Sequence, residues 1–129
     1  MNTEKPRRVL FLEDEPIISR MVTRVLMADG FDVDIAPNGL IAKEKINSGA
    51  NYDLFVFDIR TPGISGIELY EYMEKERPEL TKKVMFATGD TLNDATKDFL
   101  ERVDRPLLIK PYTLAQIKSA VRQIVDMDS

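Results

Sequence analysis

Neither cysteine nor histidine occurs among the 129 residues of the chain, and tryptophan is absent as well. Without cysteine there is no disulfide framework, and we expect a cytoplasmic protein. Without histidine the chain cannot run a Ser-His or Cys-His mechanism, and it cannot hold zinc through imidazole. These absences exclude the commonest nucleophilic hydrolases and zinc sites.

Excess positive charge and long apolar runs are missing too. The 18 basic residues are outnumbered by 22 acidic ones, for a net charge of -4. Proteins that contact nucleic acid directly usually carry a basic face, so we expect no such partner. No apolar run approaches the roughly 18 residues of a membrane span, and residues 1–8 lack the apolar core of a signal peptide. We expect no membrane partner and one domain over residues 1–129, with its core between about 8 and 125.

Five short apolar segments alternate with five segments of helical periodicity. This alternation predicts an α/β fold with a doubly wound parallel sheet, helices on both faces and right-handed crossovers. The predicted strands are 9–12, 31–36, 54–58, 84–87 and 106–109, and the predicted helices are 16–30, 40–47, 66–76, about 93–102 and a last one after Thr113.

Polar side chains stand where four of these strands end. Glu13 and Asp14 follow the first strand, Asp58 ends the third, Thr88 follows the fourth and Lys110 follows the fifth. The carboxyl ends of parallel strands meet at one edge of a sheet, where such folds bind their ligands. Each residue alone has an ordinary structural explanation, such as a helix-terminal charge or a turn residue. Their convergence instead favours a single site.

The predicted site combines three carboxylates with a lysine. Two unit charges about 4 Å apart repel by about 4 kcal/mol at an effective dielectric near 20, so a cation must offset them. Mg²⁺ prefers carboxylates, water and phosphate oxygens. An Asp58 carboxylate between a metal and Lys110 can attack phosphorus to form an aspartyl-phosphate, while both cations stabilise the phosphoryl oxygens.

At these residues the sequence resembles the receiver domains of two-component response regulators. The resemblance covers about Arg8 to Val125. It rests on the acidic pair Glu13-Asp14, the acceptor Asp58 with Pro62-Gly63 and Gly66 downstream, Thr88 within Phe86-Ala87-Thr88-Gly89, and Lys110-Pro111.

The resemblance implies a flavodoxin-like (βα)5 fold with strand order 2-1-3-4-5. It implies that Asp58 accepts a phosphoryl group from a sensor histidine kinase or a histidine phosphotransfer protein, in a phosphorelay or to control partner binding. Lys110 then pairs with the phosphate, Thr88 bonds a phosphoryl oxygen, and the Lys110-Pro111 bond is cis. The chain is expected to act as a phosphoacceptor that assists its own phosphoryl transfer and dephosphorylation, rather than as an enzyme.

The same resemblance implies a Mg²⁺ site. Asp14 and Asp58 ligate the ion together with the backbone carbonyl of Arg60, and Glu13 acts mainly through water. Whether the chain forms a homodimer is left open.

Three positions depart from the family pattern. Glu13 stands where Asp is commoner, and Thr61 stands where many relatives carry Met. Leu107, three residues before Lys110, replaces the usual Tyr or Phe, whose ring reports phosphorylation in relatives. We therefore expect intact phosphoryl chemistry and an altered readout.

Two other functions stay open on the sequence alone. An aspartate-nucleophile phosphohydrolase needs a second Asp two residues after the nucleophile, where this chain has Arg60, which cannot exchange protons at neutral pH. An inert receiver-like binding module is the other alternative. The chain ends at Ser129, which suits either a stand-alone receiver or a domain cut from a longer protein.

Two surface features are also predicted. Ile17 and Met21 lie to one side of the apolar stripe of the first helix, and we expect them to dock a kinase helix. Arg60 and Asp90 are expected at the rim of the site, where they influence the lifetime of the phosphoryl group.

Overall fold

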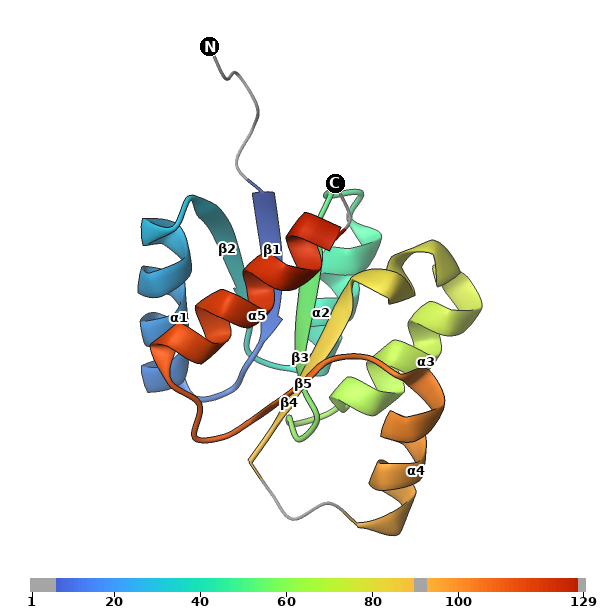
Figure 1. Cartoon of the computed structure of the whole chain (residues 1–129). Coiled ribbons are helices and arrows are strands. Elements are labelled where there is room, and N and C mark those ends of the chain that lie inside the picture. The colour runs from blue at the N-terminus through green and yellow to red at the C-terminus, as the bar shows by residue number, and fades with distance from the viewer. Residues whose placement is uncertain (1–6, 90–92, 128–129) are drawn as a thin grey trace.

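The structure is a computed structural model that describes residues 7–89 and 93–127 (Figure 1). Strands and helices alternate as predicted. In chain order they are β1 (Arg7–Leu12), α1 (Pro16–Ala28), β2 (Phe31–Ala36), α2 (Gly39–Asn47), β3 (Leu54–Asp58), α3 (Gly66–Glu76), the 3-10 helix η1 (Pro78–Lys83), β4 (Val84–Thr88), α4 (Asp94–Val103), β5 (Leu107–Ile109) and α5 (Leu114–Met127).

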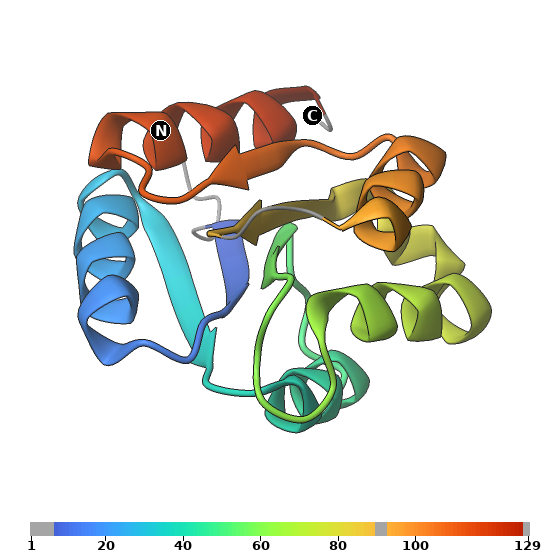
Figure 2. The ribbon, with the colours of Figure 1, turned by 90° about the horizontal axis from the view of Figure 1, so that it is seen from below.

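The five strands form one parallel sheet in the order β2-β1-β3-β4-β5. Figure 2 looks onto the edge where the strands end, with α1 and α5 on one side of the sheet and α2, α3 and α4 on the other. Each side has its own apolar cluster. The predicted flavodoxin-like fold and its strand order are therefore confirmed. In the described ranges, no helix is both long and apolar enough to cross a membrane.

The central strands are buried along nearly their whole length. All five residues of β3 and of β4 are buried, because helices cover both faces. This explains the unbroken apolar runs in the sequence. On the α3 side, Phe57 and Phe86 lie edge to face, and Phe86 also contacts Tyr70 of α3 and Phe99 of α4. Phe99 is the buried residue of α4 and anchors that helix to the sheet.

Most predicted boundaries are confirmed to within one or two residues. Asn38 caps α2 as expected, since its side chain accepts a hydrogen bond from the Ile41 amide at 2.9 Å. The predicted capping pair Thr113 and Gln116 is present before α5. The last strand is shorter than predicted, because Pro106 lies outside it. The 3-10 helix η1 was not predicted.

The start of α3 lies directly against the end of β3. Ser65 and Glu68 form a reciprocal capping box there, which satisfies two backbone amides. A Cβ added at Gly66 would lie 2.5 Å from the carbonyl oxygen of Asp58, a contact that no side chain can make. Gly66 therefore allows the helix to hold the backbone at Asp58 in place.

We expect Gly66→Ala to lower the free energy of unfolding by about 1–3 kcal/mol, because either α3 or the end of β3 must shift. Gly89→Ala is the matched control at the same edge, since its new Cβ would meet Lys110 only at an ordinary 3.4 Å. Urea unfolding of both variants measures the difference. Equal midpoints would contradict the close-approach explanation.

Candidate functional site

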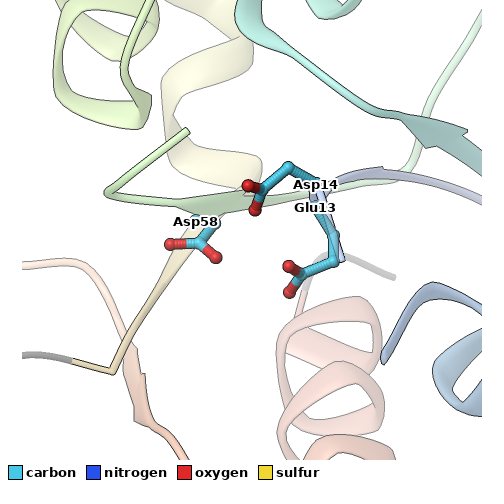
Figure 3. Close-up of side chains that lie close together, drawn as sticks. All are labelled: Glu13, Asp14 and Asp58. Carbon is cyan, nitrogen blue, oxygen red and sulfur yellow. The ribbon is translucent and has the colours of Figure 1, made fainter. Parts of the chain in front are cut away.

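The structure brings the predicted polar residues to one edge of the sheet. Glu13 and Asp14 follow β1, and Asp58 is the last residue of β3. One carboxylate oxygen from each lies within 4.8 Å of the others. Figure 3 shows these three side chains around a common space between the ends of the two strands. Their predicted convergence is confirmed.

A single ammonium group bridges two of these carboxylates. Lys110 follows β5, and its Nζ donates a hydrogen bond to Asp58 Oδ2 at 2.5 Å. The same Nζ lies 2.9 Å from Glu13 Oε1 in an ion pair. Asp58 is 4% exposed and Glu13 is 1% exposed, so the bridge is shielded from water. Buried charges need such partners, because an unpaired one would cost several kcal/mol, about 3–5 when a partner is removed.

Backbone amides hold the other oxygen of each buried carboxylate. Arg60 N donates to Asp58 Oδ1 at 3.0 Å, and Glu15 N donates to Glu13 Oε2 at 3.2 Å. Asp14 is exposed. The site therefore has two fixed carboxylates inside and one facing solvent.

The ionisable groups of the site shift one another's pKa values. Burial raises the pKa of Asp58 and of Glu13 above their usual ranges, and the contacts with Lys110 offset this only in part. Burial alone would lower the pKa of Lys110, but the hydrogen bond to Asp58 and the pairing with Glu13 together raise it. Neighbouring carboxylates thus destabilise each other's ionised form while stabilising the ammonium. An additional cation would relieve this repulsion.

Thr88 and Arg60 lie where the sequence placed them. Thr88 is buried at the end of β4, and its carbonyl accepts a hydrogen bond from the Lys110 amide at 2.7 Å. Arg60 is exposed and lines the site pocket. The predicted roles of the Thr88 hydroxyl and the Arg60 carbonyl stay predictions. Asp90, the predicted rim partner of Arg60, lies outside the described residues.

Asp14 and Asp58 line a pocket of about 580 Å³ between α1 and the segment that joins β5 to α5. Ile18 and Met21 form its wall on α1. Tyr112 and Leu114 form the opposite wall, and sequence reasoning missed both. The sequence offered one signal for Tyr112, because this aromatic residue directly follows Lys110-Pro111. The lining residues are Asp14, Glu15, Ile18, Met21, Val22, Asp58, Arg60, Gly89, Lys110, Pro111, Tyr112 and Leu114.

Comparison with known proteins agrees with this geometry. Residues 9–122 match the family model of the response regulator receiver domain. The chain belongs to this family. Curated relatives include the transcriptional regulatory protein TrcR of Mycobacterium tuberculosis, 27% identical over 96% of this chain and 47% of TrcR. Another is CusR of Escherichia coli, 29% identical over 92% of this chain and 51% of CusR. The receiver domain thus spans about half the length of the curated relatives it matches.

Solved receiver structures share the fold. A CheY-like receiver domain from Methanospirillum hungatei has a TM-score of 0.83 at 24% identity, with 95% of each chain covered. The response regulator TrrA of Thermotoga maritima, solved with Mg²⁺-BeF, has a TM-score of 0.76 at 29% identity and covers 92% of this chain and 98% of its own. The Lys110-Pro111 peptide is cis, as the resemblance implied. The acidic cluster fits the phosphoacceptor site of this family.

We expect millimolar Mg²⁺ to raise the melting temperature, because the ion relieves carboxylate repulsion in the folded state alone. A tenfold excess over Kd stabilises by about 1.4 kcal/mol, or roughly 3–6 °C for a domain of this size. Sodium chloride at equal ionic strength controls for screening, and Asp14→Asn should abolish the response. Equal shifts with both salts would contradict a specific site.

Proposed function

We propose that this receiver domain accepts a phosphoryl group on Asp58 from a phosphohistidine of a sensor histidine kinase or histidine phosphotransfer protein. The observation that carries this is the buried Asp58 carboxylate, hydrogen-bonded to Lys110 at the floor of an acidic pocket. An Asp58 oxygen attacks phosphorus and forms a P–O bond while the P–N bond breaks. The electron pair stays on the imidazole nitrogen, which takes up a proton. None of the 129 residues is a histidine, so the phosphohistidine lies outside this domain.

The surrounding residues have complementary roles in this proposal. Lys110 compensates charge on the phosphoryl oxygens, and the Thr88 hydroxyl donates a hydrogen bond to one of them. Asp14, Asp58 and the Arg60 carbonyl would hold Mg²⁺, with Glu13 acting through water. The carboxylate and carbonyl oxygens at this edge are the ligand types that this ion prefers. When bound, Mg²⁺ neutralises charge on the transferring group.

The proposal concerns a signalling module in the cytoplasm rather than an enzyme that turns over a substrate. The domain spans residues 1–129, assists the gain and loss of its own phosphoryl group, and takes part in a phosphorelay or in phosphorylation-dependent partner binding, a second copy included. It makes no direct contact with nucleic acid. The phosphohydrolase alternative loses support at Arg60, which occupies the position of the required acid/base.

The test uses a small acyl phosphate as phosphodonor, with and without Mg²⁺, and intact-mass measurement. We expect one Mg²⁺-dependent phosphoryl adduct on the wild type and none on Asp58→Asn, because the amide keeps the shape but is not a nucleophile. Circular dichroism of the variant checks the fold. Labelling of Asp58→Asn equal to wild type would refute the acceptor assignment. Multiple turnover would indicate a hydrolase, and no wild-type adduct would indicate an inert module.

The outer face of α1 fits a helix of the phosphodonor protein. Ile17 is 71% exposed and Met21 is 46% exposed, so the prediction that both reach the surface is confirmed. They lie one turn apart, and Met21 lines the pocket that holds Asp58. Arg20 and Arg24, also exposed, line the groove on the other side of α1. This apolar and basic face suits an amphipathic helix with acidic residues.

We expect Ile17→Gln combined with Met21→Gln to slow transfer from a phosphorylated donor protein by about tenfold or more, since an apolar anchor contributes about 1 kcal/mol or more. Transfer from the small phosphodonor should not change, because the chemistry at Asp58 is untouched. Leu40→Gln, at a residue of α2 that is 57% exposed, is the matched control. Equal transfer rates for the double variant and this control would rule out docking on α1.

A further inference from the structure

Two buried polar atoms beside the site have no hydrogen bond to any residue that the structure describes. One is the hydroxyl of Tyr112, and the other is Oε1 of Glu13. In the part of the chain that the structure describes, the partner of this Glu13 oxygen is Lys110 Nζ, which lies 2.9 Å away in an ion pair. A hydroxyl is a donor and a carboxylate oxygen is an acceptor, so the two groups are chemically complementary. Buried polar groups without hydrogen bonds are rare in folded proteins and call for an explanation.

Tyr112 occupies the wall between two pockets. Tyr112 directly follows Lys110-Pro111, and its side chain packs against the apolar cluster beneath α1 and α5. It lines the pocket that contains Asp58 and Lys110, and it also lines a groove of about 540 Å³ along β5 and α5. Leu107 lines the same groove. An aromatic ring therefore connects the acidic site to the surface of β5 and α5, although position 107 carries none.

The hydroxyl of Tyr112 remains a donor at neutral pH. Burial raises the pKa of Tyr112 to about 12, and the negative charge of Glu13 is the next largest cause. Lys110 acts in the opposite direction, while Asp58 and Glu15 add to the increase. The hydroxyl thus lies within the electric field of the charged groups of the site.

We propose that Tyr112 is a positioning residue of the phosphorylated state, whose hydroxyl donates a hydrogen bond to the Glu13 carboxylate once Lys110 turns toward the phosphoryl group. The proposal rests on the proposed function of Asp58. Before phosphorylation, Lys110 is the cation shared by Glu13 and Asp58. A phosphoryl group on Asp58 adds oxygens that compete for this ammonium. Glu13 is 1% exposed and cannot turn to bulk water instead. The buried Tyr112 hydroxyl, which has no hydrogen bond to the described residues and belongs to the same pocket wall as Lys110, replaces what Glu13 loses.

This exchange would move the Tyr112 ring within the wall. Because the same ring lines the groove along β5 and α5, a change of hydrogen bonding in the site alters the shape of that groove. Tyr112 thereby supplies the aromatic hydroxyl that Leu107 cannot.

The first test measures binding of beryllofluoride, a phosphoryl mimic, in the presence of Mg²⁺. We expect Tyr112→Phe to bind the mimic about three- to tenfold more weakly than wild type, the range for loss of one hydrogen bond. Without the mimic, its melting temperature should not fall, since the lost hydroxyl has no hydrogen bond to the described residues in that state. Tyr72→Phe is the matched control, because it removes an exposed hydroxyl bonded to Asn47 and should bind as wild type does.

The second measurement follows the hydroxyl itself. The chain has four tyrosines, so ¹³Cζ labelling gives four resonances that Tyr→Phe variants assign. We expect the Tyr112 resonance to shift when beryllofluoride and Mg²⁺ bind, and the Tyr72 resonance to stay in place. Equal affinity of wild type and Tyr112→Phe, or an unmoved Tyr112 resonance, would overturn the proposal while leaving Asp58 as acceptor. A wild type that fails to bind the mimic would overturn the proposed function, and this inference with it.

Discussion

The bridge from Lys110 to Glu13 and Asp58 is the interaction on which the site depends. Three carboxylates and one ammonium leave two uncompensated negative charges, which is the charge of one divalent cation. The bridge keeps Glu13 and Asp58 buried, while Asp14 is exposed to solvent. Removing Lys110 would leave two buried carboxylates unpaired, and such a loss is far costlier than losing a surface pair. The site is thus held ready for a cation and a phosphoryl group.

The rest of the fold keeps the backbone around this bridge rigid and leaves its partners free to exchange. Gly66 lets α3 press against the Asp58 carbonyl, and the Lys110 amide is tied to Thr88 at the end of β4. Both strand ends are therefore fixed by backbone contacts rather than by the charged side chains. Lys110 can change its acceptor without loosening β5, and such rearrangement within a preorganised frame is what phosphoryl transfer requires.

Much of this arrangement could be predicted from the sequence, and the parts that could not share a physical cause. Unbroken apolar runs that end in polar residues fix the order of strands and bring Glu13, Asp58 and Lys110 to one edge, because parallel strand ends must meet there. The orientation of Tyr112 depends instead on packing between α1, α5 and the sheet, which no local pattern records. The close approach at Gly66 is likewise a contact between elements. The Ser65-Glu68 capping box, by contrast, was visible in the sequence as a standard spacing and was overlooked.

The two exposed apolar surfaces lie on different elements around the site. Ile17 and Met21 are exposed on α1, where Met21 lines the site pocket. Ile109, 64% exposed, lies on the edge strand β5 and lines the same groove as Tyr112 and Leu107. A donor seated on α1 therefore need not cover β5. Both surfaces border the segment between β5 and α5, which contains Lys110 and Tyr112. A change in the acceptor of Lys110 would thus be felt at the groove along β5 and α5, which differs from the pocket beside α1. Signal entry and readout can then occupy different surfaces even though Leu107 replaces an aromatic ring.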